Sequence, residues 1–139
     1  MDESTSCSSR ESCTVCTVSD RSPAWDRYPG YRVDLLPCRS VGRVVCGGKI
    51  IAQSDACLLV QESEHDARLY FPEGDVNWEY FEASSHQTFC PFKGDASYWS
   101  LKLGDTALEN VVWSYRDPFP QVEGLKGYVS FYTENLKVE

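Results

Sequence analysis

The segment His86–Trp99, HQTFCPFKGDASYW, carries side chains whose types and spacing could support chemistry. Cys90 precedes a proline and lies three residues before Lys93, so a thiol stands near a cation that would raise its thiolate fraction. His86 lies four residues upstream and would serve as a base if the intervening chain is a loop that folds back. Cys90, Lys93 and His86 are therefore the predicted catalytic residues. The alternative is a buried structural cysteine beside a surface lysine, since free cysteines are often buried.

A second group of residues, mostly aromatic, is predicted to bind a ligand near this segment. Lys93 would bind a carboxylate or phosphate, or act as a base if desolvated, and the following glycine would let a ligand approach the backbone. The aromatic residues would line a cavity and donate hydrogen bonds around a partly apolar ligand, or would simply form the core. The predicted ligand-binding residues are Tyr70, Gly94, Tyr98, Trp99, Trp113, Tyr115 and Tyr132.

Three further polar residues are assigned to turns or surface. Asp75 and Asp95 are weaker acid–base candidates, because aspartates at such positions more often cap turns. His65 lies in the acidic stretch ESEHDAR and is predicted to be solvated surface.

Composition limits the class of protein. The chain has 139 residues, which suits one domain, and its aromatic content of 13% favours β structure. Its net charge is −8 and its basic residues are scattered, so nucleic acid is not an expected partner. No apolar stretch approaches the roughly 20 residues of a membrane span, and the N-terminus lacks the apolar core of a signal peptide. We therefore expect a soluble, cytoplasmic protein; its oligomeric state is not predicted.

The seven cysteines do not indicate a disulfide framework, because the chain shows no secretion signal. Cys13 and Cys16 have the spacing of half a zinc site, but no second such pair follows. We therefore expect neither a metal site nor a cofactor.

The pattern along the chain predicts two parts. Residues 1–24 are rich in Ser, Cys and charge and are predicted to be a disordered tail, whereas residues 25–139 form one domain. Within the domain, 25–37 reads as an irregular arm, 74–81 as a short helical turn and 84–94 as a loop. Alternating or apolar runs, including a hairpin with its turn at Gly47-Gly48, predict strands in 43–52, 56–61, 67–71, 96–103, 110–115 and 128–132.

Several motifs together resemble one known family. Cys90-Pro-Phe-Lys-Gly94 is followed by Ala96-Ser-Tyr-Trp99, and four further elements come in matching order: RVVCGGKIIAQS, LYFP with a later DV, VWSY with a later Pro, and VSFY. This pattern, covering about residues 28–136, resembles the bacterial and fungal family called domain of unknown function 427.

The resemblance implies a β-tent fold, similar to methionine sulfoxide reductase B. Several β-tent proteins bind zinc through two CxxC pairs, which the domain lacks. A nucleotidyltransferase label attached to the family would require Gly-Ser followed by Asp-x-Asp, and the chain contains neither.

Taken together, these patterns predict a mostly β fold: a single small β-tent or barrel-like antiparallel domain with little helix. The predicted function is binding of a small, partly apolar ligand at the Cys90–Trp99 segment, with an anionic group for Lys93. Whether the domain is also an enzyme, of lyase, isomerase or hydrolase type, stays open. The alternative is a non-catalytic binding or interaction module in which the motif is structural. Redox chemistry at Cys90 is less favoured, because no resolving cysteine is near in sequence.

Overall fold

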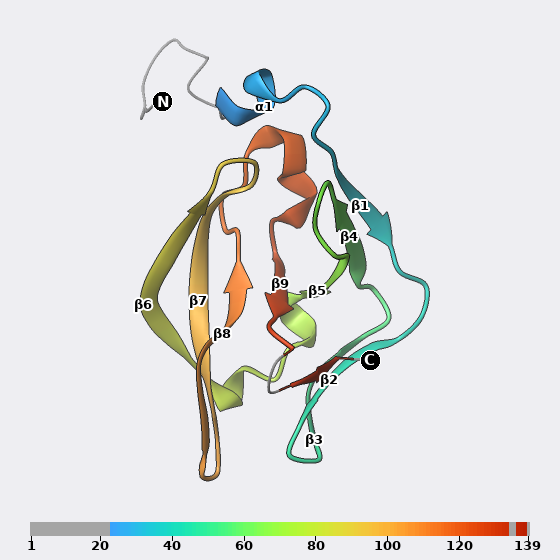
Figure 1. The fold of residues 1–139 in the computed structure, drawn as a ribbon. Helices are drawn as coiled ribbons and strands as arrows, with labels where there is room; N and C mark the ends of the chain where they lie inside the picture. The colour runs from blue at the N-terminus through green and yellow to red at the C-terminus, as the bar shows by residue number, and fades with distance from the viewer. Residues whose placement is uncertain (1–22, 134–135, 139) are drawn as a thin grey trace.

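Two antiparallel sheets make up the domain in the computed structural model, which describes residues 23–133 and 136–138 (Figure 1). The larger sheet has seven strands and the smaller has three. In spatial order the larger contains β1 (Val33–Pro37), β4 (Leu58–Glu62), β5 (Arg68–Pro72), β9 (Tyr128–Phe131), β8 (Thr106–Ser114), β7 (Gly94–Leu103) and β6 (Phe81–Cys90). The smaller contains β10 (Lys137–Val138), β2 (Gly42–Cys46) and β3 (Lys49–Ser54).

The large sheet is open, because its outer strands β1 and β6 do not pair with each other within the described residues. It therefore does not close into a barrel. The prediction of a small, mostly β, antiparallel domain is confirmed.

Helical structure is confined to short pieces. The only α-helix among the described residues is α1 (Pro23–Arg27), and three 3₁₀ segments follow: η2 (Glu73–Asp75), η3 (Trp78–Tyr80) and η4 (Pro120–Leu125). The prediction of a helical turn in 74–81 is confirmed by η2 and η3. Among the residues described, no helix has the length and apolar character needed to cross a membrane.

Side-chain alternation gives the large sheet two buried faces. Phe71, Leu101 and Val112 belong to a core that also contains residues of β2 and β3. Their neighbours along the same strands point the other way, and Tyr70 and Trp113 belong to a second core rich in aromatic side chains. We call this second side of the sheet the aromatic face.

The predicted hairpin is confirmed as β2 and β3, and its Gly47 and Gly48 have φ of 56° and 80°. The predicted loop 84–94 is wrong for most of its length. Residues up to Cys90 belong to β6, which pairs with β7 across a register shift between Ala83 and Gln87. This edge strand is polar and largely exposed on both sides, so it lacks the hydrophobic alternation that identifies a strand.

The segment 25–37, predicted to be an irregular arm, contains the larger part of α1 and all of β1, and β1 pairs with β4. The predicted tail, with Cys13 and Cys16, lies outside the described residues except for Pro23 and Ala24, which begin α1.

Candidate functional site

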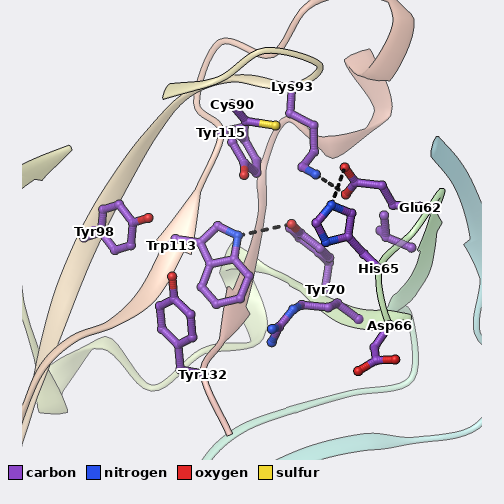
Figure 2. A pocket seen from close by; sticks show the side chains of 12 residues that line it. Glu62, His65, Asp66, Tyr70, Cys90, Lys93, Tyr98, Trp113, Tyr115 and Tyr132 are labelled. Carbon is purple, nitrogen blue, oxygen red and sulfur yellow. Dashed lines mark hydrogen bonds and ion pairs between the residues drawn. The ribbon is translucent and has the colours of Figure 1, made fainter. Parts of the chain in front are cut away.

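A cavity of about 250 Å³ opens on the aromatic face (Figure 2). It collects residues from the strands β4 to β9 and from the turns between them, because these strands place alternate side chains on the same face. Its lining residues are Val60, Glu62, His65, Asp66, Arg68, Tyr70, Cys90, Lys93, Tyr98, Trp113, Tyr115 and Tyr132. Seven of these were predicted as site residues: Tyr70, Cys90, Lys93, Tyr98, Trp113, Tyr115 and Tyr132.

Lys93 enters the pocket from the tight turn between β6 and β7. Its backbone N–H donates to the Cys90 carbonyl at 3.2 Å, and Gly94 then reverses the chain with φ of 116°. A Cβ at Gly94 would meet the Asp117 carbonyl oxygen only at an ordinary contact distance of 3.4 Å, so the positive φ, which strains any other residue, is what requires glycine here. Gly94 therefore shapes the turn and does not itself line the cavity.

The Lys93 ammonium forms a buried ion pair with Glu62. Lys93 Nζ donates to Glu62 Oε1, and the two side chains are only 8% and 11% exposed. The ammonium also lies 5.7 Å from the ring centroid of Tyr115. The reading of Lys93 as a surface lysine is therefore wrong, because the turn directs the side chain inward.

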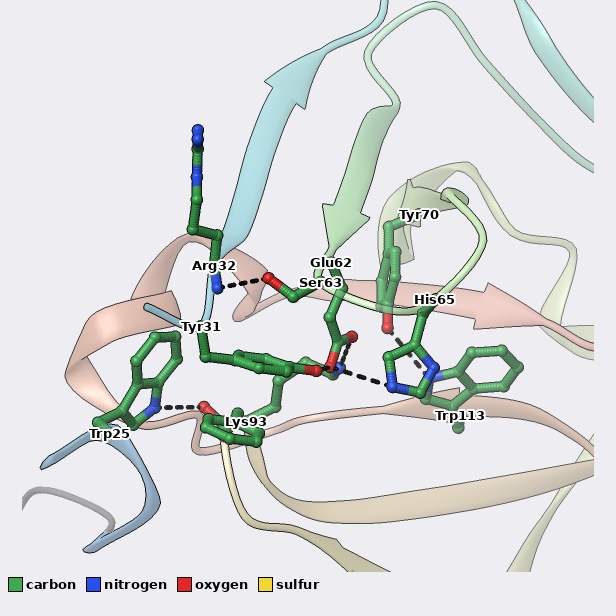
Figure 3. A network of polar contacts seen from close by, with 10 residues as sticks. Trp25, Tyr31, Arg32, Glu62, Ser63, His65, Tyr70, Lys93 and Trp113 are labelled. Carbon is green, nitrogen blue, oxygen red and sulfur yellow. Dashed lines mark hydrogen bonds and ion pairs between the residues drawn. The ribbon is translucent and has the colours of Figure 1, made fainter. Parts of the chain in front are cut away.

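The second oxygen of Glu62 is also engaged (Figure 3). The Tyr31 hydroxyl donates to Oε2, and His65 Nε2 lies 3.9 Å from the same oxygen. Burial first, and then the hydrogen bond to Glu62, raise the pKa of Tyr31 well above its usual value, so the phenol is a neutral donor. Glu62 is thus held from both sides, which suits a carboxylate that orients Lys93.

Residues 23–32, which overlap the segment 25–37 predicted from the sequence, fasten the turn that carries Lys93 (Figure 3). From here on, the arm means residues 23–32. Trp25 Nε1 donates to the Phe92 carbonyl at 2.7 Å. The Tyr31 ring stacks on Phe92 with centroids 3.6 Å apart and an interplanar angle of 8°. The arm therefore connects directly to the ion pair through Tyr31 and to its turn through Phe92.

Two truncations test the role of the arm. Removing residues 1–22 is expected to leave the melting temperature within about 1 °C, since termini without apolar periodicity add little stability. Removing residues 1–32 takes away the Trp25 hydrogen bond, the Tyr31 hydroxyl and the stacking on Phe92, each worth roughly 1 kcal/mol. We expect a fall of more than about 5 °C by differential scanning fluorimetry. Equal melting temperatures for the two truncations would contradict the docking role of the arm.

Hydrogen bonds fix the aromatic walls of the pocket. The Trp113 indole N–H donates to the Tyr70 hydroxyl at 3.1 Å, and the Tyr98 hydroxyl lies 2.8 Å from Thr88 Oγ1. At the mouth, the Arg68 guanidinium lies 5.2 Å from the centroid of the Trp113 ring, within the range of a cation–π contact. These contacts hold the rings in place before any ligand arrives.

Cys90 is half-buried and is the last residue of β6, at the rim of the pocket near Lys93 (Figure 2). In contrast, Cys46 and Cys57 are buried in the opposite core. The structure therefore brings together the thiol and the cation that the sequence motif proposed.

His86 does not join Cys90 at the pocket. It lies within β6, and four residues of extended strand span about 13 Å. Its ring lies 4.6 Å from the Tyr98 ring, and it belongs to a separate surface depression with Ser84 and Ser85. The expectation of a loop that brings His86 back as a base to Cys90 is corrected, because the segment is a strand.

Trp99 also lies away from the pocket. It packs against the opposite core, with its ring centroid 5.2 Å from that of Trp78. Trp99 and Tyr98 are neighbours on β7, so alternation sends them to opposite faces.

Several functional candidates were missed by the sequence analysis. His65 is 64% exposed, as expected for solvated surface, but it also lines the mouth of the pocket. The position of Glu62 at the end of an apolar strand could have indicated a site, because a carboxylate buried there needs a charged or hydrogen-bonding partner. The missed residues are Tyr31, which acts through Glu62, and the pocket residues Val60, Glu62, His65, Asp66 and Arg68.

The described part of the chain contains no group of three or more His, Cys, Asp or Glu side chains placed to hold a metal ion. Asp75 ends η2 and is absent from the lining of the cavity, as is Asp95 on β7. The polar groups that line the pocket are therefore phenols, one thiol, the Trp113 indole, the His65 imidazole and the charged side chains of Glu62, Asp66, Arg68 and Lys93.

The fold and cavity define a small antiparallel β domain with a pocket walled by aromatic residues. Residues 34–139 match the model of a family described as domain of unknown function (DUF427), and the chain belongs to this family. The arm with Tyr31 precedes the matched residues. No curated protein matches the chain.

Proposed function

We propose that this DUF427 domain binds a small molecule in the aromatic pocket. The observation that carries the proposal is the Lys93–Glu62 ion pair, buried at the wall of a cavity rather than in a packed core. A buried ion pair contributes little net stability, because desolvation offsets the attraction between the charges. Ligand pockets characteristically combine aromatic walls with a few convergent polar groups. The site thus has the features of a binding pocket and little value as a stability element.

The size of the pocket limits the ligand. The cavity of about 250 Å³ lies just below the range of roughly 300–1,000 Å³ for drug-sized ligands. The ligand is therefore a compact molecule, such as one substituted six-membered ring. Aromatic side chains on several sides favour a ligand with an apolar body.

Enzyme activity is a second candidate, and Cys90 is the observation that favours it. Its half-buried thiol and the Lys93 ammonium share the pocket, an arrangement suited to nucleophilic or acid–base chemistry. Lyase, isomerase and hydrolase reactions all fit these groups. In the non-catalytic alternative, the same motif only shapes the turn. Cys90→Ala separates the two, since it would abolish turnover in an enzyme but leave most of the affinity of a binding module.

A blocking variant tests the binding proposal. Cys90→Met adds volume at the pocket rim, and Cys38→Met adds the same volume at another half-buried cysteine that packs against the opposite core. In a screen of ring-containing fragments by thermal shift, a fragment at one hundred times its Kd should stabilise the wild type by about 2.7 kcal/mol. We expect Cys90→Met to abolish these shifts and Cys38→Met to retain them. Shifts that survive in both variants would place binding elsewhere.

A further inference from the structure

We infer that the ligand is a neutral carbonyl compound whose oxygen accepts hydrogen bonds from the hydroxyls of Tyr70 and Tyr115. This inference rests on the proposed function and names the ligand class for the same pocket.

Tyr70 supplies the first donor. Its hydroxyl oxygen accepts from the Trp113 indole, so the hydroxyl proton is directed elsewhere. No acceptor for that proton is found among the described residues, although Tyr70 is only 2% exposed. Leaving a buried donor unsatisfied costs about 1–3 kcal/mol, so the arrangement indicates a group other than a protein side chain as the acceptor.

Tyr115 supplies the second donor. The residue follows β8 and is 8% exposed, and its hydroxyl makes no hydrogen bond with the described part of the chain. Figure 2 shows this hydroxyl pointing into the pocket, on the side toward Tyr70 and Trp113. A carbonyl oxygen has two lone pairs and can accept from two donors at once. The pair of phenols thus matches one carbonyl.

Both phenols stay protonated in the pocket. Burial is the largest cause that raises the pKa of Tyr70 and of Tyr115 well above the usual value for a phenol. The neighbouring Tyr70 and Glu62 raise the pKa of Tyr115 further, and Glu62 also raises the pKa of Tyr70. They therefore act as donors throughout the physiological range of pH.

The charges of the pocket favour a neutral ligand over an anionic one. Lys93 is already paired with Glu62, and the lining also contains one further acid, Asp66, and one further base, Arg68. The charges of Lys93, Glu62, Asp66 and Arg68 sum to zero. A carboxylate ligand would add a third anion near Glu62 and would have to compete with Glu62 for the Lys93 ammonium, while the other lining cation, Arg68, lies against the Trp113 ring at the mouth. The inferred ligand thus differs from the one expected from the sequence, which carried an anionic group for Lys93, and the benzoate comparison below distinguishes the two.

A matched pair of probes tests the inference: acetophenone and ethylbenzene differ at one carbon, which carries the carbonyl oxygen only in acetophenone. Kd values would be measured by NMR titration for the wild type, for Tyr115→Phe and for the control Tyr80→Phe, which lies in η3 beside the opposite core. We expect the wild type and the control to bind acetophenone at least tenfold more tightly than ethylbenzene. Tyr115→Phe should reduce that preference to threefold or less, while leaving the affinity for ethylbenzene nearly unchanged.

The possible outcomes distinguish failure of the carbonyl inference from failure of the proposed binding function. Equal affinities of the two probes for the wild type would overturn the carbonyl inference and leave the binding function standing. Tighter binding of benzoate than of acetophenone would also overturn it, since the site would then select an anion. If neither probe binds, the proposed function fails for ligands that fit the cavity, and the inference fails with it.

Discussion

Replacing Glu62 with glutamine is expected to lower the free energy of unfolding by about 3–5 kcal/mol. The reason is that the change leaves the Lys93 ammonium buried without its counter-charge, and breaking one side of a buried pair has this cost. Lys93→Met should be destabilising for the converse reason. The double variant Glu62→Gln, Lys93→Met should lose much less than the sum of the two single losses, because it leaves no unpaired ion. Urea denaturation of the four proteins gives the interaction energy directly.

Glu82 and Lys102 provide a matched control on the surface of the same sheet. Their side chains are 63% and 71% exposed and form an ion pair at 3.5 Å. Glu82→Gln should change stability by no more than about 1 kcal/mol, since exposed pairs contribute little. Similar small losses for Glu62→Gln and Glu82→Gln would show that the Lys93 pair is open to water and would remove the main support for a built pocket.

The cysteines should differ in alkylation rate by at least about 100-fold in the native protein. Burial raises the pKa of Cys57 to about 11, so at pH 8 only about one in a thousand of its thiols is ionised. Its side chain is also inaccessible in the core. Cys90 is half-buried and faces the cavity, so iodoacetamide should reach it much sooner. Peptide mass spectrometry after timed quenching would give both rates.

The rate at which Cys57 is alkylated should increase with pH. The ionised fraction of Cys57 grows as pH rises toward about 11, so its labelling should accelerate throughout that rise if the fold persists. Half-buried Cys38, on the other side of the sheet, serves as the control for exposure without a pocket. A Cys90 that labels as slowly as Cys57 would place its thiol out of reach of ligands and end its candidacy as a nucleophile.

The main strands were predictable because their alternating side chains match the two faces that the sheet buries. In β7 the alternation places Leu101 in one core and the small Ala96 with Tyr98 in the other, which a period of two requires. The Gly47-Gly48 hairpin was equally clear, since few other residues adopt two successive positive φ angles. Edge strand β6 was missed because exposure on both sides removes the alternation.

The candidate site was only half predictable. Cys90 and Lys93 lie in one turn, so proximity in sequence was enough to place them together. Glu62 lies 31 residues before Lys93 in the sequence, and Tyr31 lies another 31 residues before Glu62. Both come from the part of the sheet around β1 and β4, so only tertiary structure brings them to Lys93. Placing His86 with Cys90 required a folded-back loop, and the extended backbone of β6 separates them instead. Sequence distance is therefore a guide to contact only where the backbone conformation is known.

The four tryptophan indoles provide the most direct test of ligand binding in the aromatic pocket. Only Trp113 lines the cavity, whereas Trp78 and Trp99 pack against the opposite core and Trp25 docks on the turn after β6. In a two-dimensional ¹H–¹⁵N NMR titration with acetophenone, we expect the Trp113 indole signal to move in a saturable way, because its N–H bonds to Tyr70. The Trp78 and Trp99 signals should stay in place. A Trp113 signal that does not move at saturating acetophenone, or equal shifts at Trp99, would contradict the assignment of this pocket as the binding site.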